Sequence, residues 1–300
     1  MRGTASALRA AVTCTVTAAV MAVGLVGLRP AAAAFTIHKV DDARFTVSPD
    51  APVFILVMGN DGRPGDTVTR GDALHLIGVN PGQGKATILD IPRDTFVPIP
   101  GRGSGRDKIN SAHASGGPAL EAKAVGSLVG VDVPFVVDTD FQGLTDIVDE
   151  LGGLDFTVPF AMNDSFSGAI YSPGPTHFDG VSALAFARNR HLDGGDFTRT
   201  SDQGLLLLAG LAQLRAQHAD ATSLLKDVVA FGRHGRLDGL SLADVYRLGR
   251  LAIGLDPANV RNVVMPGSGA DVGGASVVLV DPAAASLFAD FRDDGILESH

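Results

Sequence analysis

Two stretches, "VFILVMGNDGR" at residues 53–63 and "TRGDALHLIGVNPGQGKATILDIPRDT" at residues 69–95, contain three short apolar runs. The runs cover 53–59, 73–80 and 85–92, and each has the length and composition of a buried β-strand. The sequence "PGQG" between the second and third runs is a turn signal, so these two runs are predicted to form a β-hairpin.

Downstream of the hairpin, segments with helical and strand character alternate. This alternation predicts an α/β fold, a three-layer α-β-α sandwich around a mixed central sheet. We expect one exported domain over residues 51–300, preceded by a connector at 35–50. The predicted helices are 117–130, 142–153, 179–188, 203–217, 241–252 and 282–292, and the further strands are 134–141, 154–160, 260–267 and 275–281.

The N-terminal segment, residues 1–34, has the features of an export signal. Arg2 and Arg9 precede the uncharged run 10–28, whose 19 residues would span about 28 Å as a helix, close to the thickness of a bilayer. Basic residues before such a run place the rest of the chain outside the membrane. We favour a retained transmembrane helix, so that the membrane is an expected partner. The alternative is that "RPAAAAF" contains a signal-peptidase site of the A-x-A type and that the protein is secreted after cleavage.

Composition excludes several classes of function. A net charge of −9 and a pI near 5.2 argue against nucleic-acid binding, which needs a broad basic surface. The single cysteine, Cys14, rules out a disulfide framework and a cysteine-based metal site. Any anionic ligand must therefore be bound by a local cluster of basic residues.

Charged pairs stand at the ends of the three predicted strands. If the hairpin forms, these pairs meet at one edge of the sheet, where ligands of α/β proteins bind. Two carboxylates can hold Mg²⁺, and arginines donate paired hydrogen bonds to phosphate oxygens. Taken singly, each pair is more often a surface ion pair. The pairs are Asp61 with Arg63, Arg70 with Asp72, and Arg93 with Asp94.

A second cluster lies at 183–203, "ALAFARNRHLDGGDFTRTSDQ", which has three arginines and no lysine. Arg188 and Arg190 are two residues apart, so an extended backbone would project both to the same side. The leucine-rich stretch that follows offers apolar surface, with Leu205, Leu208 and Leu211 on one helical face. That surface suits either ordinary core packing or a lipid tail.

Residues 50–220 resemble the LytR-CpsA-Psr family, and the blocks "IPRDT", "KIN" and "RNRH" together are quite specific. The family consists of exported, membrane-anchored cell-wall enzymes of Gram-positive bacteria. The resemblance implies a phosphotransferase that uses magnesium and no ATP. Such an enzyme moves a glycopolymer from a polyprenyl diphosphate carrier to a sugar hydroxyl of peptidoglycan and releases polyprenyl phosphate.

The resemblance also implies roles for single residues. Asp61 and Asp72 match the carboxylates of the magnesium and catalytic site, and which of them is the base stays open. Arg93 belongs to the catalytic set and contacts the diphosphate. Lys108 of "KIN" is either a ligand contact or a structural ion pair. The other residues implied to bind the diphosphate are Arg70, Arg188, Arg190, Arg199 and Gln203, with Asp196 in the same block as Arg199.

Two positions depart from the family pattern and put the substrate range in doubt. Asp202 precedes Gln203, where a negative charge should weaken diphosphate binding unless it faces away or pairs with Arg199. Asp90 replaces a small polar residue before "IPRDT". Two other functions use the same residues, a polyprenyl diphosphate hydrolase and a non-catalytic polyprenyl phosphate binding module. The identity of the glycopolymer stays open.

Overall fold

A mixed sheet of seven strands forms the centre of the computed structural model, which describes residues 35–41, 48, 51–62, 66, 69–103, 105–217 and 235–298. The three apolar runs become three neighbouring strands of this sheet. The order across the sheet is β12 (Gly235–Asp238), β1 (Phe35–Lys39), β7 (Phe135–Thr139), β2 (Val53–Asn60), β3 (Gly71–Asn80), β4 (Lys85–Asp90) and β13 (Val260–Val264).

The predicted hairpin is confirmed. Strands β3 and β4 are antiparallel, with Asn80 opposite Lys85 on either side of the turn. Strand β2 is also antiparallel to β3, so the ends of β2 and β4 lie at the same edge as the start of β3. This pairing brings the charged strand ends together, as expected from the sequence.

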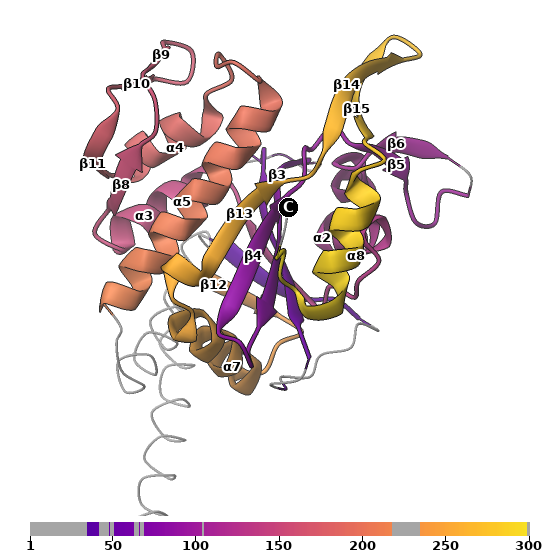
Figure 1. The fold of residues 1–300 in the computed structure, drawn as a ribbon, viewed down its shortest axis with the longest axis horizontal. Helices are drawn as coiled ribbons and strands as arrows, with labels where there is room; N and C mark the ends of the chain where they lie inside the picture. The colour runs from indigo at the N-terminus through magenta and orange to yellow at the C-terminus, as the bar shows by residue number, and fades with distance from the viewer. Residues whose placement is uncertain are drawn as a thin grey trace, which may run out of the picture. The chain divides into compact units, whose positions relative to one another are not determined.

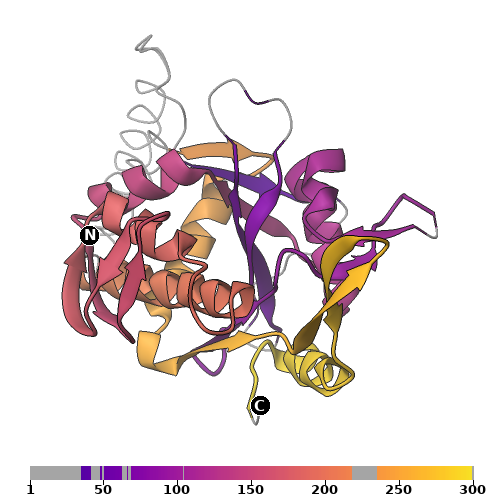
Figure 2. The ribbon, with the colours of Figure 1, turned by 90° about the horizontal axis from the view of Figure 1, so that it is seen from above.

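Helices cover both faces of the sheet, which confirms the three-layer sandwich (Figure 1). Helices α2 (Ser111–Val129) and α8 (Ala284–Asp294) lie on one face and pack through a large apolar core that includes Leu56, Leu74 and Phe291. The view from above separates this layer from the opposite one (Figure 2). The opposite layer consists of α3 (Phe141–Glu150), α4 (Gly180–Arg188), α5 (Asp196–Gln217) and α7 (Leu242–Gly254).

A second apolar core lies within the α3–α5 layer. It includes Val148 of α3, Phe186 of α4 and Leu206 of α5, which pack with two short strand pairs. This layer is therefore held together partly by its own packing, independent of the sheet. The strand pairs are β8 (Leu154–Val158) with β11 (Gly174–Phe178), and β9 (Met162–Asp164) with β10 (Ala169–Tyr171).

Several predicted elements differ in position or extent. Residues 35–39, assigned to the connector, form β1 because Phe35 and Ile37 are buried between the sheet and its helices. Strand β8 forms as predicted but outside the central sheet. The same holds for β15 (Ala275–Val280), which pairs with β14 (Gly267–Val272) in a projecting hairpin (Figure 1). The remaining short elements are β5 (Phe96–Pro98), β6 (Arg106–Lys108) and the 3₁₀ turn η1 (Pro257–Asn259).

Two helices begin earlier than the sequence predicts. Helix α2 starts at Ser111 and bends where Gly116 and Gly117 leave the helical conformation. Helix α5 starts at Asp196, seven residues before the predicted start, and so includes the charged "DFTRTSD" block. Helix α7 begins with the capping box predicted at Ser241 and Asp244.

Within the described ranges, no helix is both long enough and apolar enough to cross a membrane. The predicted transmembrane or signal segment at 10–28 and Arg63 lie outside those ranges.

Gly78 in β3 provides a test of how closely α8 packs on the sheet. A Cβ at this position would lie 2.5 Å from the backbone oxygen of Gly295 and 2.7 Å from the ring of Phe291. Gly78→Ala is expected to lower the free energy of unfolding by about 1–3 kcal/mol, measured by urea denaturation.

Gly254→Ala is the matched control, because open space surrounds that position at the end of α7. Its stability should stay equal to that of the wild type or rise by up to about 1 kcal/mol. Equal stability of the two variants would contradict the close packing at Gly78.

Candidate active site

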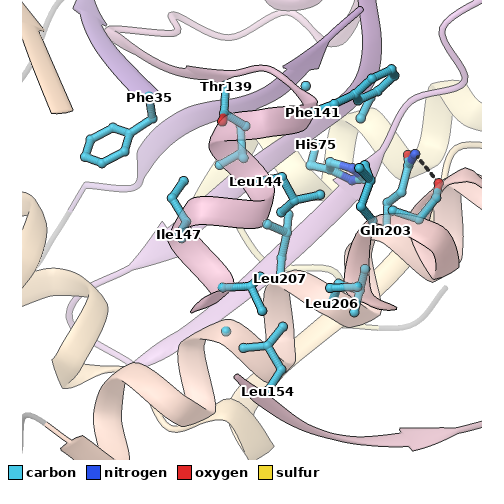
Figure 3. Close-up of a pocket in the computed structure, with 18 of the residues that line it drawn as sticks. Phe35, His75, Thr139, Phe141, Leu144, Ile147, Leu154, Gln203, Leu206 and Leu207 are labelled. Carbon is cyan, nitrogen blue, oxygen red and sulfur yellow. Dashed lines mark hydrogen bonds between the residues drawn. The ribbon is translucent and has the colours of Figure 1, made fainter. Parts of the chain in front are cut away.

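A cavity of about 510 Å³ lies between the central sheet and helices α3, α4 and α5 (Figure 3). It follows α5 from Gln203 to Gln217, a distance of about 20 Å along a helix axis. Asp72 and Arg188 stand with Gln203 among its lining residues, whereas most of the wall is apolar. The labelled apolar side chains of the wall are Phe35, Phe141, Leu144, Ile147, Leu154, Leu206 and Leu207.

The leucines of α5 contribute both to core packing and to the apolar cavity wall, the two roles considered from the sequence. Leu206, Leu207, Leu211 and Leu214 line the cavity. Leu206 also belongs to the second core, and Leu205 packs against that core. The predicted shared face of Leu205, Leu208 and Leu211 is therefore wrong. The helix starts at Asp196 and lies between two layers, so its apolar side chains are divided between core and cavity.

Asp72 reaches the cavity because of a β-bulge. Gly59 pairs with Ala73 and Asn60 pairs with Gly71, which leaves Asp72 as an extra residue without a partner across the ladder. Regular alternation would put Asp72 on the face of Leu74, in the core below α2. The bulge instead places Asp72 beside Ala73 in the cavity wall.

An ion pair joins Asp72 to Arg93, which follows β4. Both side chains are largely buried, with exposed fractions of 21% and 17%. Burial lowers the pKa of Arg93, but the carboxylates of Asp72, Asp196 and Asp94 outweigh this effect and raise it above its ordinary value. Arg93 is therefore firmly cationic.

Asp196, in the first turn of α5, binds two further arginines. Its Oδ1 atom lies 2.7 Å from Nη2 of Arg199 and 3.4 Å from Nη2 of Arg190. Arg199 also donates to the backbone oxygen of Asp72 at 3.4 Å. Burial lowers the pKa of Arg199 to about 10, and the neighbouring Arg93 and Arg190 act in the same direction. One carboxylate thus gathers these arginines next to Asp72.

Arg188 is the last residue of α4, and its guanidinium lies 5.1 Å from the ring centre of Phe141 in a cation–π contact. The backbone becomes extended only from Asn189, the C-cap residue. The expectation that Arg188 and Arg190 share an extended segment is therefore wrong. The two arginines reach the site from a helix end and from a loop.

Asp61 and Arg70 extend the β2–β3 pairing beyond the strands. Oδ1 of Asp61 accepts the backbone N–H of Arg70 at 2.7 Å, and the backbone N–H of Asp61 donates to the carbonyl of Arg70 at 3.1 Å. Asp61 is thereby held opposite Arg70, which precedes Asp72 by two residues along the chain. The Arg70 side chain is exposed.

Gln203 and Lys108 have different surroundings. Nε2 of Gln203 donates to the backbone oxygen of Ala187 at 2.9 Å, and its Oε1 atom is buried without a partner among the described residues (Figure 3). Nζ of Lys108 lies 3.2 Å from Oδ1 of Asp94, which is the structural ion pair considered from the sequence. Lys108 is not part of the cavity wall.

The described residues contain no group of three His, Cys, Asp or Glu side chains that could by itself hold a metal ion. Magnesium does not require such a group, since it is commonly bound by one or two carboxylates together with substrate phosphates and water. Asp72 in the cavity wall, with Asp61 beyond the end of the neighbouring strand β2, fits this second kind of site.

Two buried acidic groups lie near the site. Glu121 has no signal in the sequence that marks it as part of the site, and Asp90 stands out there only as a departure from the family pattern. Glu121 of α2 lies against Gly71, where a Cβ would come within 2.7 Å of both carboxylate oxygens. Burial raises the pKa of Glu121 to about 8, against the effect of His113. Asp90 is fully buried and bonded to His75, which lines the cavity.

Asp202, the first departure from the family pattern, is buried in α5 and does not line the cavity. It has no ion pair with Arg199, whose partner is Asp196. Burial raises the pKa of Asp202 to about 7, so the group is largely protonated below neutral pH. The position and this pKa remove the expected repulsion of a diphosphate.

Comparison with known proteins identifies the family of the chain. The model of the LytR_cpsA_psr family matches residues 29–289. The chain belongs to the LytR-CpsA-Psr family. A Bacillus cereus protein named polyisoprenyl-teichoic acid–peptidoglycan teichoic acid transferase TagU is 38% identical over 158 residues, which are 52% of this chain and 51% of that protein. The chain thus matches about half the length of this curated relative.

Solved structures of the LytR-CpsA-Psr family share the fold over nearly their whole length. Bacillus subtilis TagV matches with a TM-score of 0.68 and 25% identity, covering 83% of this chain and 99% of TagV. A structure of TagT with bound octaprenyl pyrophosphate lipid matches with a TM-score of 0.64 and 24% identity, covering 86% of this chain and 97% of TagT.

The buried carboxyl of Asp202 predicts a pH-dependent stability. Its folded-state pKa of about 7 exceeds the ordinary value of 3.8, so it stabilises the fold when protonated. That contribution is complete below about pH 4 and is lost as the pH rises through 7. Between pH 5 and pH 8 the loss is about 2.5 kcal/mol, since each pKa unit is worth about 1.4 kcal/mol.

Asp202→Asn removes the titrating group. The stability difference between variant and wild type, measured by urea denaturation, is expected to shift in favour of the variant by about 2.5 kcal/mol from pH 5 to pH 8. A difference that does not change with pH would show that the Asp202 carboxyl is not held in a desolvated environment.

Proposed function

We propose that the chain is a phosphotransferase that moves a glycopolymer from a polyprenyl diphosphate carrier to a sugar hydroxyl of peptidoglycan. The observation that carries this proposal is an apolar cavity about 20 Å long with arginines and aspartates near its Gln203 end. A polyprenyl diphosphate has the matching chemistry, an anionic head and a long apolar tail. The activity in the name of the TagU relative supports the same function.

The arginines bind and neutralise the diphosphate. Phosphoryl transfer depends mainly on positioning and on stabilising the charge of the transferring group. Arg93 and Arg199 are held rigidly by carboxylates, so their orientation is set before the substrate binds. Arg188 and the exposed Arg70 and Arg190 supply further donors around the head group.

The transfer step forms one bond and breaks one. The oxygen of the acceptor hydroxyl attacks the phosphorus that carries the glycopolymer, and the bridging P–O bond to the second phosphate breaks. Asp61 or Asp72 accepts the proton of the hydroxyl. The products are a phosphodiester between glycopolymer and peptidoglycan and a polyprenyl phosphate.

Magnesium belongs to this proposal. Asp61 and Asp72 would hold the ion together with diphosphate oxygens, and the ion would neutralise part of the charge on the phosphates. We further propose that the segment 10–28 anchors the chain in the cell membrane, with the catalytic domain on the outer side. The support for this location is the uncharged run preceded by Arg2 and Arg9.

Arg93→Ala and Asp72→Ala are expected to lower the release of polyprenyl phosphate by at least about 100-fold, because they remove charge stabilisation and a candidate base. The measurement uses the full chain in detergent with a synthetic polyprenyl diphosphate sugar, magnesium and a peptidoglycan acceptor. Arg250→Ala, an exposed arginine on α7, is the matched control and should keep wild-type activity.

The controls separate the competing functions. Release that requires the acceptor supports the transferase, whereas release without acceptor would indicate a hydrolase. Tight binding with no release by the wild type would leave only a lipid-binding module. Full activity in EDTA would refute the role of magnesium.

Gly210→Leu tests whether the cavity holds the polyprenyl tail. Gly210 of α5 lines the cavity, and no atom lies within 4 Å of a Cβ placed there. A leucine should therefore fill cavity space without disturbing the fold. The KM for a long-chain donor is expected to rise about tenfold or more, while a donor with a two-isoprene tail is affected less. An equal effect on both donors would contradict this location of the tail.

A further inference from the structure

A buried histidine–aspartate pair lies in the wall of the cavity. Nδ1 of His75 on β3 is 2.5 Å from Oδ1 of Asp90 on β4, and the two residues are directly opposite in the antiparallel ladder. Asp90 is fully buried and His75 is only 3% exposed. Such a pair is costly to bury unless its groups are well bonded, so it needs an explanation.

The pair is oriented toward the cavity. Ala73 and His75 both line the cavity, because alternate residues of β3 face the α5 side of the sheet. His75, Phe141 and Gln203 all line this cavity, and Figure 3 shows the three side chains toward the same end of it. Since Nδ1 is bound to Asp90, Nε2 is the nitrogen left for a molecule in the cavity. This is the arrangement in which a carboxylate orients an imidazole for catalysis.

The position of His75 along the cavity indicates which part of the polyprenyl diphosphate donor it would contact. Asp72 marks the edge where the acceptor attacks, and His75 is three residues further along β3, about 10 Å away. The phosphate that bears the prenyl chain must lie on the cavity side of the transferred phosphate. His75 and its neighbour Gln203 therefore face the leaving phosphate.

We propose that His75 is the general acid of the reaction and that Asp90 positions it. This inference rests on the proposed phosphotransferase function. As the bridging P–O bond breaks, Nε2 of His75 gives its proton to the leaving phosphate oxygen. The proton taken from the acceptor hydroxyl by Asp61 or Asp72 balances the one delivered, and polyprenyl hydrogen phosphate leaves. After release, Asp61 or Asp72 gives its proton to solvent and His75 regains one.

Charged groups from several elements line the same cavity as His75 or pack behind its wall. Asp90 stands opposite on β4, and burial raises its pKa, while His75 and the Asn262 amide of β13 limit that rise. Asp72 on β3 and Asp140 and Glu150 of the cavity wall are acidic, and Arg188 of α4 is the basic group of the wall. Asp202 of α5 is buried behind the wall and largely protonated below neutral pH.

His75→Gln is expected to lower kcat for polyprenyl phosphate release by about 100-fold or more, since general acids contribute at least that factor. The KM for the donor should stay within about threefold of the wild-type value. In the wild type, kcat should fall on the alkaline side as His75 loses its proton, and this decrease should be absent in His75→Gln. Thermal unfolding of both proteins verifies that the variant is folded.

Asp90→Asn tests the positioning role. An amide keeps the size of the side chain but removes the charge that stabilises the imidazolium, so the alkaline decrease of kcat should move to lower pH. His177→Gln is the matched control, because His177 forms an exposed pair with Asp155 at 2.8 Å, away from the cavity. It should leave kcat and its pH profile unchanged.

A second measurement is independent of turnover. Geranyl diphosphate, added to the full chain labelled with ¹⁵N-histidine, should shift the Nε2 resonance of His75, which is assigned by its absence in His75→Gln. Binding without a shift of this resonance would overturn the proposal. So would a kcat of His75→Gln within threefold of a functioning wild type. A wild type that releases no polyprenyl phosphate would instead refute the phosphotransferase function itself.

Discussion

The antiparallel pairing of β3 with both β2 and β4 determines where the groups of the site lie. It brings the ends of β2 and β4 to the start of β3, and so puts Asp61 and Arg93 on either side of Asp72. The same ladder places His75 opposite Asp90. A one-residue slip in this register would move each of these side chains to the opposite face of the sheet. The site thus depends on backbone hydrogen bonding before it depends on any charge.

Helix α5 connects the charged end of the site to the apolar cavity. Its first turn carries Asp196 and Arg199, next to Asp72, and its later turns supply the leucines of the wall. An amphiphilic ligand therefore meets both of its binding regions along one rigid element. The helix is held in turn by the second core, where Leu206 packs with α3 and α4. Packing in that layer sets the distance between the arginines and the sheet.

Much of this arrangement follows from the sequence by local rules. The turn "PGQG" predicts the hairpin, and counting outward from Asn80 and Lys85 already pairs His75 with Asp90. The bulge at Asp72 could not be predicted, because the local sequence carries no signal for an extra residue in β3, and the approach of Glu121 to Gly71 is seen only in the fold. The early start of α5 was missed because two glycines precede Asp196 and indicate a loop, although an acidic residue in a first turn is a helix signal.

The protonation of buried carboxyls decides the charge that a diphosphate meets. Glu121 and Asp202 are desolvated, and burial raises the pKa of Glu121 to about 8 and that of Asp202 to about 7, so they add less negative charge near the cavity than their number suggests. The carboxylates at the edge are each bonded to arginine side chains or to backbone N–H groups. Arg93, Arg190 and Arg199 are bonded to two of these carboxylates, Asp72 and Asp196, which leaves one positive charge in excess for an anionic ligand.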